Sequence, residues 1–309
     1  MCRIVYIDRL TGKKEEEQVY GKLALEFLYG DSWWSRIFGR ILLPLLVKFP
    51  YFSQWYGFLQ NRPSSARKIR PFIEKYHIEV SEFLNPVESF CSFNDFFCRK
   101  LRPEARPLVR GKYTAIIPAD GRFLFYQDVS LVDGFVVKGK KFGLEALLGN
   151  RGLSEVYKKG AMVIGRLCPV DYHRFHFPCD GIPGESKLLN GYLSSVNPLA
   201  LKKNVNTFTE NKRFLCEIET KYFGRVLMIE IGATNVGSIS QIYNSKTSYV
   251  KGDEKGFFAF GGSSLILLFE PERILFDEDL LRLSQNHVEV KCLLGQSLGC
   301  ASFFIDKKE

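Results

Sequence analysis

The sequence lacks the spacings that mark common metal and nucleotide sites. None of its eight cysteines lies in a C-x-x-C pair, and none of its four histidines lies in an H-E-x-x-H arrangement. Its glycine-rich turn at residues 232–237 has neither a G-x-G-x-x-G fingerprint nor a P-loop lysine. These absences argue against a zinc ribbon, a zinc protease, a thioredoxin-type redox site and a nucleotide fingerprint. We therefore expect no metal ion in this protein.

Long apolar runs are also missing. Residues 41–47 are apolar, but they fall far short of the about 20 that a membrane-spanning helix needs, and Pro44 interrupts them. The N-terminus has no apolar stretch of signal-peptide length. Because the cysteines are scattered through a chain that does not need disulfides, we expect reduced thiols in a cytosolic compartment.

The chain does have a globular composition and a clear positive balance. Its hydrophobic share is 46%, its charged share is 25% and its formal net charge is +9. Its 309 residues permit one large domain or two ordinary ones. The basic balance predicts an anionic partner, such as nucleic acid, a membrane surface or acidic metabolites. Nucleic acid is not expected, because no zinc finger, helix-turn-helix or RNA-binding signature is present.

Residues 1–110 are expected to be helical after a first strand at residues 2–8, and they are rich in aromatic side chains. All three tryptophans, Trp33, Trp34 and Trp55, lie here. Two interpretations stay open: core helices of a soluble domain, or an interfacial segment with aromatic side chains in the bilayer and basic ones on lipid phosphates. The basic residues include Arg36, Arg40, Lys48, Arg62, Arg67, Lys68 and Arg70. The last four have no acidic neighbours, which slightly favours the membrane.

A docking helix is predicted near the end of this part. Ser92 or Asn94 can cap it, and Pro103 ends it. Its apolar face consists of Phe93, Phe96, Phe97 and Leu101.

Residues 111–309 alternate between short apolar segments and turns, which predicts a β-rich domain of short, mostly antiparallel strands. Combined with the helical residues 1–110, this pattern predicts an α+β fold.

Residues 256–270 contain Gly261-Gly262-Ser263-Ser264 between an aromatic run and an apolar run. Two glycines permit a tight turn with backbone angles closed to other residues. A serine hydroxyl in such a turn lies near the carbonyl carbon of the preceding peptide bond, which suits attack on the chain's own backbone. A plain hairpin turn is the commoner meaning of this pattern. The α/β-hydrolase elbow is excluded because Leu265, not glycine, lies two residues after Ser263.

Two of the four histidines, His173 and His176, lie three residues apart among aromatic side chains. Desolvation by such neighbours keeps an imidazole neutral, as a general base near pH 7 requires. A zinc site is disfavoured because no third or fourth ligand is close. Asp120 lies in a Pro-x-Asp-Gly turn, where an isolated aspartate is most often only a turn residue.

Four motifs occur in this order: Pro118-Ala-Asp-Gly121, Asp171-Tyr-His-Arg-Phe-His176, Gly232-Ala-Thr-Asn-Val-Gly237 and Gly262-Ser263. Together with the stretch that begins Phe93-Asn-Asp-Phe-Phe97, they resemble the phosphatidylserine decarboxylase family in its proenzyme form. The resemblance extends from about residue 93 to the C-terminus, and the first 90 residues match only in character.

The resemblance implies that the chain cuts itself between Gly262 and Ser263. Ser263 would attack the Gly262 carbonyl, His176 would take the hydroxyl proton, and Asp120 would orient and stabilise the imidazolium. The products would be a long chain of residues 1–262 and a short chain of residues 263–309. Ser263 would become a pyruvoyl group, which forms a Schiff base with the substrate amine.

The resemblance also implies the reaction and its location. Phosphatidylserine would lose carbon dioxide to give phosphatidylethanolamine, and His173 would handle the substrate carboxylate or deliver the proton. The protein would be peripheral, on the cytoplasmic face of the cell membrane and in contact with its anionic surface. The two chains would stay together, and a homodimer is left open. Because this chain has Gly-Gly-Ser-Ser where many bacterial members have Leu-Gly-Ser-Thr, a cut before Ser264 also stays open.

Two further interpretations belong to other classes. A membrane-associated serine hydrolase would use the same Asp120, His176 and Ser263 in an uncut chain. A non-enzymatic lipid-binding protein would have an intact chain and a dispensable Ser263.

Overall fold

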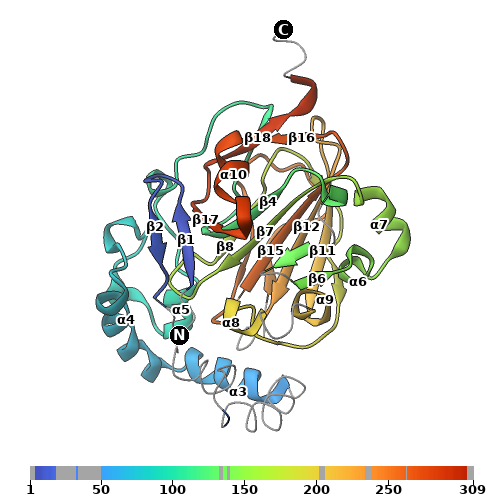
Figure 1. The fold of residues 1–309 in the computed structure, drawn as a ribbon. Coiled ribbons are helices and arrows are strands. Elements are labelled where there is room, and N and C mark those ends of the chain that lie inside the picture. The colour runs from blue at the N-terminus through green and yellow to red at the C-terminus, as the bar shows by residue number, and fades with distance from the viewer. Residues whose placement is uncertain are drawn as a thin grey trace.

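The computed structural model describes residues 4–18, 33, 50–131, 135–137, 140–201, 206–233, 239–261 and 263–304. Most of the molecule is built on one ten-stranded sheet, in the order β10-β11-β12-β15-β7-β4-β17-β1-β2, with β9 paired to β11 (Figure 1). Its strands are β1 (Val5–Asp8), β2 (Lys14–Glu16), β4 (Gly121–Tyr126), β7 (Ala161–Leu167), β9 (Ile182–Pro183), β10 (Lys187–Leu189), β11 (Arg213–Glu219), β12 (Arg225–Gly232), β15 (Ser263–Phe269) and β17 (Glu289–Cys292).

The central strands are buried on both faces, which explains their nearly continuous apolar sequences. Every residue of β7, β4 and β15 is buried. All pairings in this sheet are antiparallel except the parallel pair β1–β17. The expected β-rich part with mostly antiparallel strands is therefore confirmed.

Smaller sheets and helices cover the two faces. One cluster of buried residues joins the odd-numbered residues of β15 to the sheets β13-β14-β8 and β16-β18-β3. The other joins its even-numbered residues to short helices. The small sheets consist of β3 (Thr114–Ile116), β8 (Arg174–His176), β13 (Ile239–Gln241), β14 (Glu254–Phe258), β16 (Ile274–Phe276) and β18 (Ser297–Ala301), and β5 (Phe135–Val137) pairs with β6 (Lys140–Phe142). The helices of this half are α6 (Leu144–Leu148), α7 (Arg151–Tyr157), α8 (Pro198–Leu201), α9 (Thr207–Glu210) and α10 (Glu278–Leu283).

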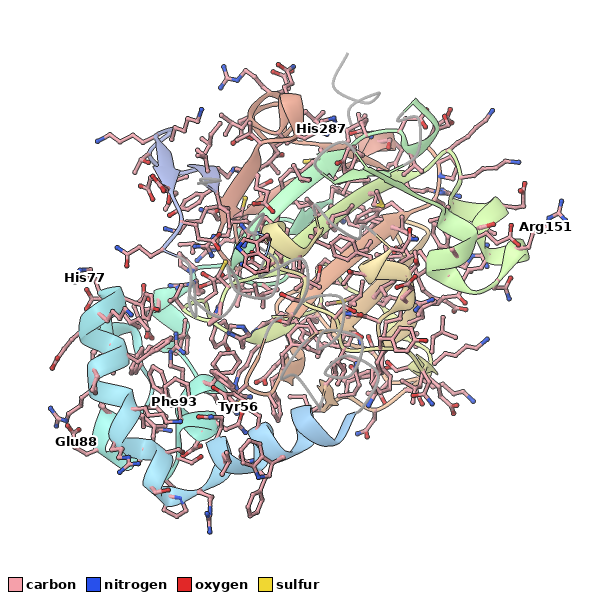
Figure 2. The ribbon with its side chains drawn as sticks, turned by 60° about the horizontal axis from the view of Figure 1, so that its bottom comes forward. Tyr56, His77, Glu88, Phe93, Arg151 and His287 are labelled. Atoms are coloured by element: carbon pink, nitrogen blue, oxygen red, sulfur yellow. The ribbon has the colours of Figure 1, made fainter. Side chains whose placement is uncertain are left out.

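Residues 50–97 form a separate helical layer with an aromatic core. It contains α3 (Pro50–Asn61), α4 (Ile69–Tyr76) and α5 (Phe93–Phe97). Phe93 and Tyr56 lie where this layer meets the rest of the molecule, whereas His77 and Glu88 lie at its outer edge (Figure 2).

The predicted docking helix is present as α5, capped by the Ser92 hydroxyl, which accepts from the Asp95 N–H at 3.1 Å. The helix ends at Phe97, well before Pro103, because the chain turns there and Leu101 forms an isolated bridge with Phe83.

The first strands do not lie with the helices. The β1–β2 hairpin forms an edge of the ten-stranded sheet through β17, so residues 4–17 belong structurally with the β-rich part. The α+β class is confirmed. Expectations for residues 20–49, apart from the position of Trp33, fall outside the described residues. Among the helices that are described, none has the length and apolarity to cross a membrane.

Candidate functional site

Ser263 is the first residue of β15 and is fully buried. Its Cα lies in register with Leu167 of β7 and Gly232 of β12. Its hydroxyl has no hydrogen-bond partner among the described residues. Gly261, two residues earlier, has a φ of 146°, a conformation that glycine tolerates and other residues do not. Gly262 lies outside the described residues.

Ser264 has a different environment from Ser263, because successive side chains of a strand point to opposite faces. Its hydroxyl donates to the Gly165 carbonyl at 2.5 Å. Of the two serines, Ser264 is therefore held by the neighbouring strand and Ser263 is the one with an unused hydroxyl.

His176 lies on β8, and one of its ring nitrogens carries no hydrogen. Its Nδ1 is 2.9 Å from the Gly252 carbonyl oxygen. Because a carbonyl can only accept, Nδ1 carries the hydrogen and Nε2 is left as a base. The Tyr172 hydroxyl lies 3.4 Å from Nε2 and can donate to it. Burial lowers the pKa of His176, which favours the neutral ring.

Asp120 is buried and its carboxylate is held by Arg106. Arg106 Nη2 donates to Oδ2 at 2.7 Å, and Nε lies 3.0 Å from each oxygen. The Leu294 N–H also donates to Oδ1 at 2.9 Å. No hydrogen bond joins Asp120 to His176 among the described residues. The two are nonetheless neighbours, because the His176 N–H donates to Pro118 O and the Asp120 charge raises the pKa of His176 against the effect of burial.

His173 carries another buried polar atom that, like Ser263 Oγ, has no partner among the described residues. Its Nδ1 lies 2.9 Å from the Asp171 carbonyl, so Nδ1 carries the hydrogen. Its Nε2 has no partner among the described residues. Burial lowers the pKa of His173 to about 4, so the ring is neutral near pH 7.

Aromatic contacts connect His173 to the residues that lead into Ser263. The rings of Phe97 and His173 have centroids 3.9 Å apart, and those of Phe97 and Phe260 are 4.9 Å apart. The His173 carbonyl also accepts the Phe258 N–H at 2.9 Å. The unpartnered His173 Nε2 therefore lies in an aromatic region that includes Phe260, three residues before Ser263, whose hydroxyl is also unpartnered. Buried polar groups are rarely left unpaired, so both indicate a site built for chemistry or for a ligand.

A buried charge network fixes the loop that leads to His173. Arg122 pairs with Asp171, whose carboxylate also accepts the Cys168 N–H at 2.6 Å. Arg166 pairs with both Glu17 and Glu289, at 2.6 Å each. Glu17 follows β2, so its ion pair with Arg166 connects the N-terminal hairpin to this charge network.

A further pair, Lys255 and Glu230, was not singled out from the sequence. Lys255 Nζ donates to Glu230 Oε1 and to Gln241 Oε1 at 2.8 Å each, and all atoms of the Lys255 and Glu230 side chains are buried. Glu230 pairs in register with Leu265, so it lies on the same sheet face as Ser263. No local spacing could have shown this pair, because its members lie on different strands.

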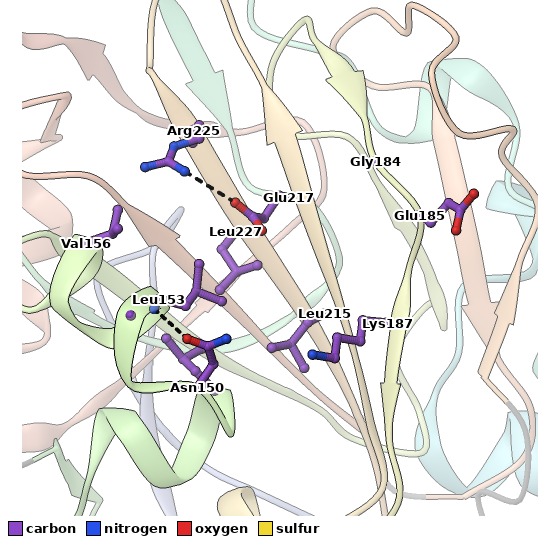
Figure 3. Close-up of a pocket in the computed structure, with 12 residues that line it drawn as sticks. Asn150, Leu153, Val156, Gly184, Glu185, Lys187, Leu215, Glu217, Arg225 and Leu227 are labelled. Atoms are coloured by element: carbon purple, nitrogen blue, oxygen red, sulfur yellow. Dashed lines mark hydrogen bonds and ion pairs between the residues drawn. The ribbon is translucent and has the colours of Figure 1, made fainter.

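A pocket of about 490 Å³ lies between α7 and strands β10–β12 (Figure 3). Arg225 and Leu227 of β12 line it, and Gly232 at the other end of β12 pairs with Ser263. With about 3.4 Å per strand residue, this pocket lies roughly 20 Å from Ser263 along the strand. It is a separate feature from the site of Ser263. The described residues contain no cluster of metal-ligating side chains.

Comparison with known proteins assigns the chain to a family. The model of the family described as phosphatidylserine decarboxylase matches residues 93–300. A phosphatidylserine decarboxylase proenzyme of Chlamydia pneumoniae is 51% identical over 294 residues, which cover 95% of this chain and 96% of the relative. Relatives with the same description from Chlamydia felis and Chlamydia trachomatis are 49% and 44% identical, over 97% and 96% of this chain and 98% and 97% of their own lengths. These matches span nearly the whole sequence, and a buried, unpartnered serine lies at the predicted cleavage position. This chain therefore belongs to the phosphatidylserine decarboxylase family.

Proposed function

We propose that this member of the phosphatidylserine decarboxylase family cuts its own chain between Gly262 and Ser263 and converts Ser263 into a pyruvoyl group. The activity follows from the family: the enzyme is a carboxy-lyase that converts phosphatidylserine to phosphatidylethanolamine and carbon dioxide. The observation that carries the cleavage proposal is the buried, unpartnered Ser263 hydroxyl.

The contrast between the two serines supports Ser263 as the nucleophile. The Ser264 hydroxyl is already used in a hydrogen bond to Gly165 O, and its side chain belongs to the other face of the sheet. The Ser263 hydroxyl has no hydrogen bond to a described residue, so none of these would have to break before it attacks the preceding carbonyl. The alternative cut before Ser264 is therefore disfavoured.

His176 is the proposed base for the cut. As Ser263 Oγ bonds to the Gly262 carbonyl carbon, the hydroxyl proton moves to Nε2. The imidazolium then gives this proton to the Ser263 nitrogen as the C–N bond breaks, so the amide becomes an ester with a free Ser263 amine. Gly252 O holds the ring through Nδ1–H, and the nearby Asp120 charge stabilises the imidazolium. Loss of the Ser263 α-proton then breaks the Cβ–Oγ bond and frees the Gly262 carboxylate. Addition of water releases ammonia and leaves the ketone.

The pyruvoyl ketone would supply the electron-withdrawing carbonyl that serine lacks when carbon dioxide leaves the substrate. Among the two roles expected for His173, its geometry favours proton transfer over binding of a carboxylate. A bare, neutral Nε2 repels another acceptor, but it can take up a proton. Because its pKa is about 4, the protonated ring would give that proton up readily to a carbanion.

The two chains would stay associated after the cut. Ser263 begins β15, which lies in the sheet between β12 and β7 of the long chain. The short chain would also contain β17, which pairs with β4 and β1. Both β15 and β17 are therefore held by long-chain strands on both sides.

The helical layer is proposed as the membrane-associating part of residues 1–110, with residues 111–309 carrying the chemistry. Trp55 and Phe58 of α3 are 56% and 59% exposed, and the Arg62 guanidinium lies 5.5 Å from the Phe58 ring centroid. Exposed aromatic side chains beside a cation suit the interface of an anionic bilayer. This surface would place the protein peripherally on the cytoplasmic face of the cell membrane.

A paired comparison tests the proposal. Ser263→Ala and Ser264→Ala are each incubated with vesicles of phosphatidylserine labelled in the serine carboxyl, and released carbon dioxide is counted. We expect release from Ser264→Ala and none from Ser263→Ala. The proposal fails if Ser263→Ala decarboxylates as the wild type does, or if uncut wild-type protein reacts with a fluorophosphonate at Ser263, as a serine hydrolase would.

A further inference from the structure

Arg106 connects the helical part of the molecule to the turn that carries Asp120. Its Nη1 donates to Glu82 Oε1 at 2.9 Å and its Nη2 to Glu82 Oε2 at 3.1 Å. The opposite edge of the same guanidinium holds Asp120. Nη1 also donates to the Ala105 carbonyl at 2.7 Å. All five N–H groups of the guanidinium thus have an acceptor, which a lysine could not reproduce.

The bridge is largely removed from solvent. The side chains of Arg106 and Asp120 are 11% and 5% exposed, and that of Glu82 is 33% exposed. Burial disfavours the charged guanidinium, but hydrogen bonds and charges of Asp120 and Glu82 outweigh it and raise the pKa of Arg106 above its usual value. The arginine is therefore a fixed cation beside Asp120.

We propose that Arg106 is a positioning residue for self-cleavage, because it fixes the Asp120 carboxylate beside His176 and joins it to Glu82 of the helical part. This inference rests on the proposed function. Arg106 touches neither Ser263 nor the bond that is cut, so it acts through Asp120. Among the described residues, Asp120 forms no other ion pair, although its charge also acts on the buried Arg99.

The bridge formed by Arg106 also affects the electrostatic environment of the His176 ring. The charged groups that act on the His176 ring are Asp120, Glu254 and Arg174, and Arg174 is paired with Glu254. Arg106 offsets part of the Asp120 charge. Its removal would leave the surroundings of His176 more negative, which stabilises the imidazolium. Cleavage, which needs the neutral ring as a base, would then require a higher pH.

The test follows the cut in freshly synthesised precursor by denaturing electrophoresis, from pH 5 to 9. Misplacing a catalytic group by about 1 Å can cost about 100-fold, so we expect Arg106→Gln to cut roughly ten- to a hundredfold more slowly. Its pH midpoint should rise by roughly 0.5–1 unit. Arg106→Lys should keep the wild-type midpoint but cut more slowly, because it keeps the charge without the fork. Glu82→Gln, which leaves the contacts to Asp120, should stay within about threefold of the wild type.

Arg9 provides a matched control. It is 12% exposed and also joins two carboxylates, Asp277 and Asp279, but it does not contact Asp120. Arg9→Gln should lower the thermal midpoint without moving the pH midpoint of cleavage. In the Asp120→Asn background, Arg106→Gln should add little further loss if it acts through Asp120.

The outcomes separate this inference from the proposed function. A wild-type rate in Arg106→Gln or in Arg106→Lys overturns the positioning role. So does a slowed Arg106→Gln whose pH midpoint equals that of the wild type. If Arg106→Gln does not fold, Arg106→Lys alone decides by its rate. A wild-type precursor that never cuts would instead overturn the self-cleavage proposal.

Discussion

At the scale of single residues, the site is marked by polar atoms that folding leaves without partners. Ser263 Oγ and His173 Nε2 are both buried and unpaired among the described residues. Leaving such groups unsatisfied costs about 1–3 kcal/mol each, so they weaken the precursor fold. In our proposal, Ser263 Oγ is the nucleophile of self-cleavage and His173 Nε2 transfers a proton to the bound substrate.

The unusual burial of His173 predicts a specific pH dependence of stability. Burial lowers the pKa of His173 from 6.5 to about 4, so the unfolded chain binds a proton that the folded chain does not between these values. Stability should therefore fall as pH falls from about 6.5 to about 4, by about 3 kcal/mol. Urea unfolding of the uncut Ser263→Ala protein at pH 7.5 and pH 4.5 measures this loss.

The matched variants are His173→Leu and His77→Gln, each made in the same Ser263→Ala protein. Replacing His173 should make the loss of stability clearly smaller, whereas replacing the exposed His77 should leave it in place. An equal loss with and without His173 would show that its proton is not excluded by folding.

At the scale of elements, local pattern predicted much of the fold but not its long-range connections. The apolar run that forms β15 and the helix cap at Ser92 were visible because apolar runs and capping residues are local signals. The partnership of β1 with β17 was not visible, because it joins residues near opposite ends of the chain.

The site residues also divide into those marked by local spacing, which could be predicted, and those brought together only by folding. The tight glycine-serine turn and the pair of histidines were visible as spacings, so Ser263, His173 and His176 could be named. The acceptor for His176 Nδ1 is a backbone carbonyl, that of Gly252, and every residue has one. Arg106 could not be singled out from the sequence, because folding brings its two partners, Glu82 and Asp120, to it. The role of Asp120 in a triad stays a prediction.

The β1–β2 hairpin should matter for stability through Glu17. Burial opposes the charge of Glu17, but Arg166 and Arg122 hold the pKa of this carboxyl below its usual value. Removing one partner of a buried ion pair costs about 3 kcal/mol or more. We expect Glu17→Ala to lower the free energy of unfolding by that amount in urea titrations at pH 7.

Glu16→Ala on the same hairpin is the control, since Glu16 is exposed. Its effect should stay within about 0.5 kcal/mol. Equal effects of the two substitutions would mean that the buried network does not depend on the hairpin.

At the scale of the whole molecule, our proposal assigns membrane binding to the helical layer and the chemistry to the sheet. Burying an aromatic or aliphatic side chain contributes about 1.5–3 kcal/mol, so replacing both Trp55 and Phe58 with serine should weaken binding to phosphatidylserine-containing vesicles by at least about tenfold. Vesicle sedimentation measures the partition. Self-cleavage should proceed at the wild-type rate, because neither side chain touches the site.

Leu275→Ser tests whether the loss of any exposed apolar side chain weakens vesicle binding. Leu275 is 39% exposed on β16, at the other end of the molecule from α3 (Figure 1). It should leave vesicle binding unchanged. A loss of binding equal to that of the α3 variant would contradict a membrane surface on the helical layer.

The central claim is that Ser263 becomes the reactive group when the chain cuts itself. Intact mass spectrometry of the purified wild-type protein, with tandem sequencing of any short fragment, tests it most directly. We predict two chains, residues 1–262 and residues 263–309, with a pyruvoyl group in place of Ser263 in the shorter one, and a single uncut chain for Ser263→Ala. A folded, active wild-type protein that contains only the intact chain would contradict the account.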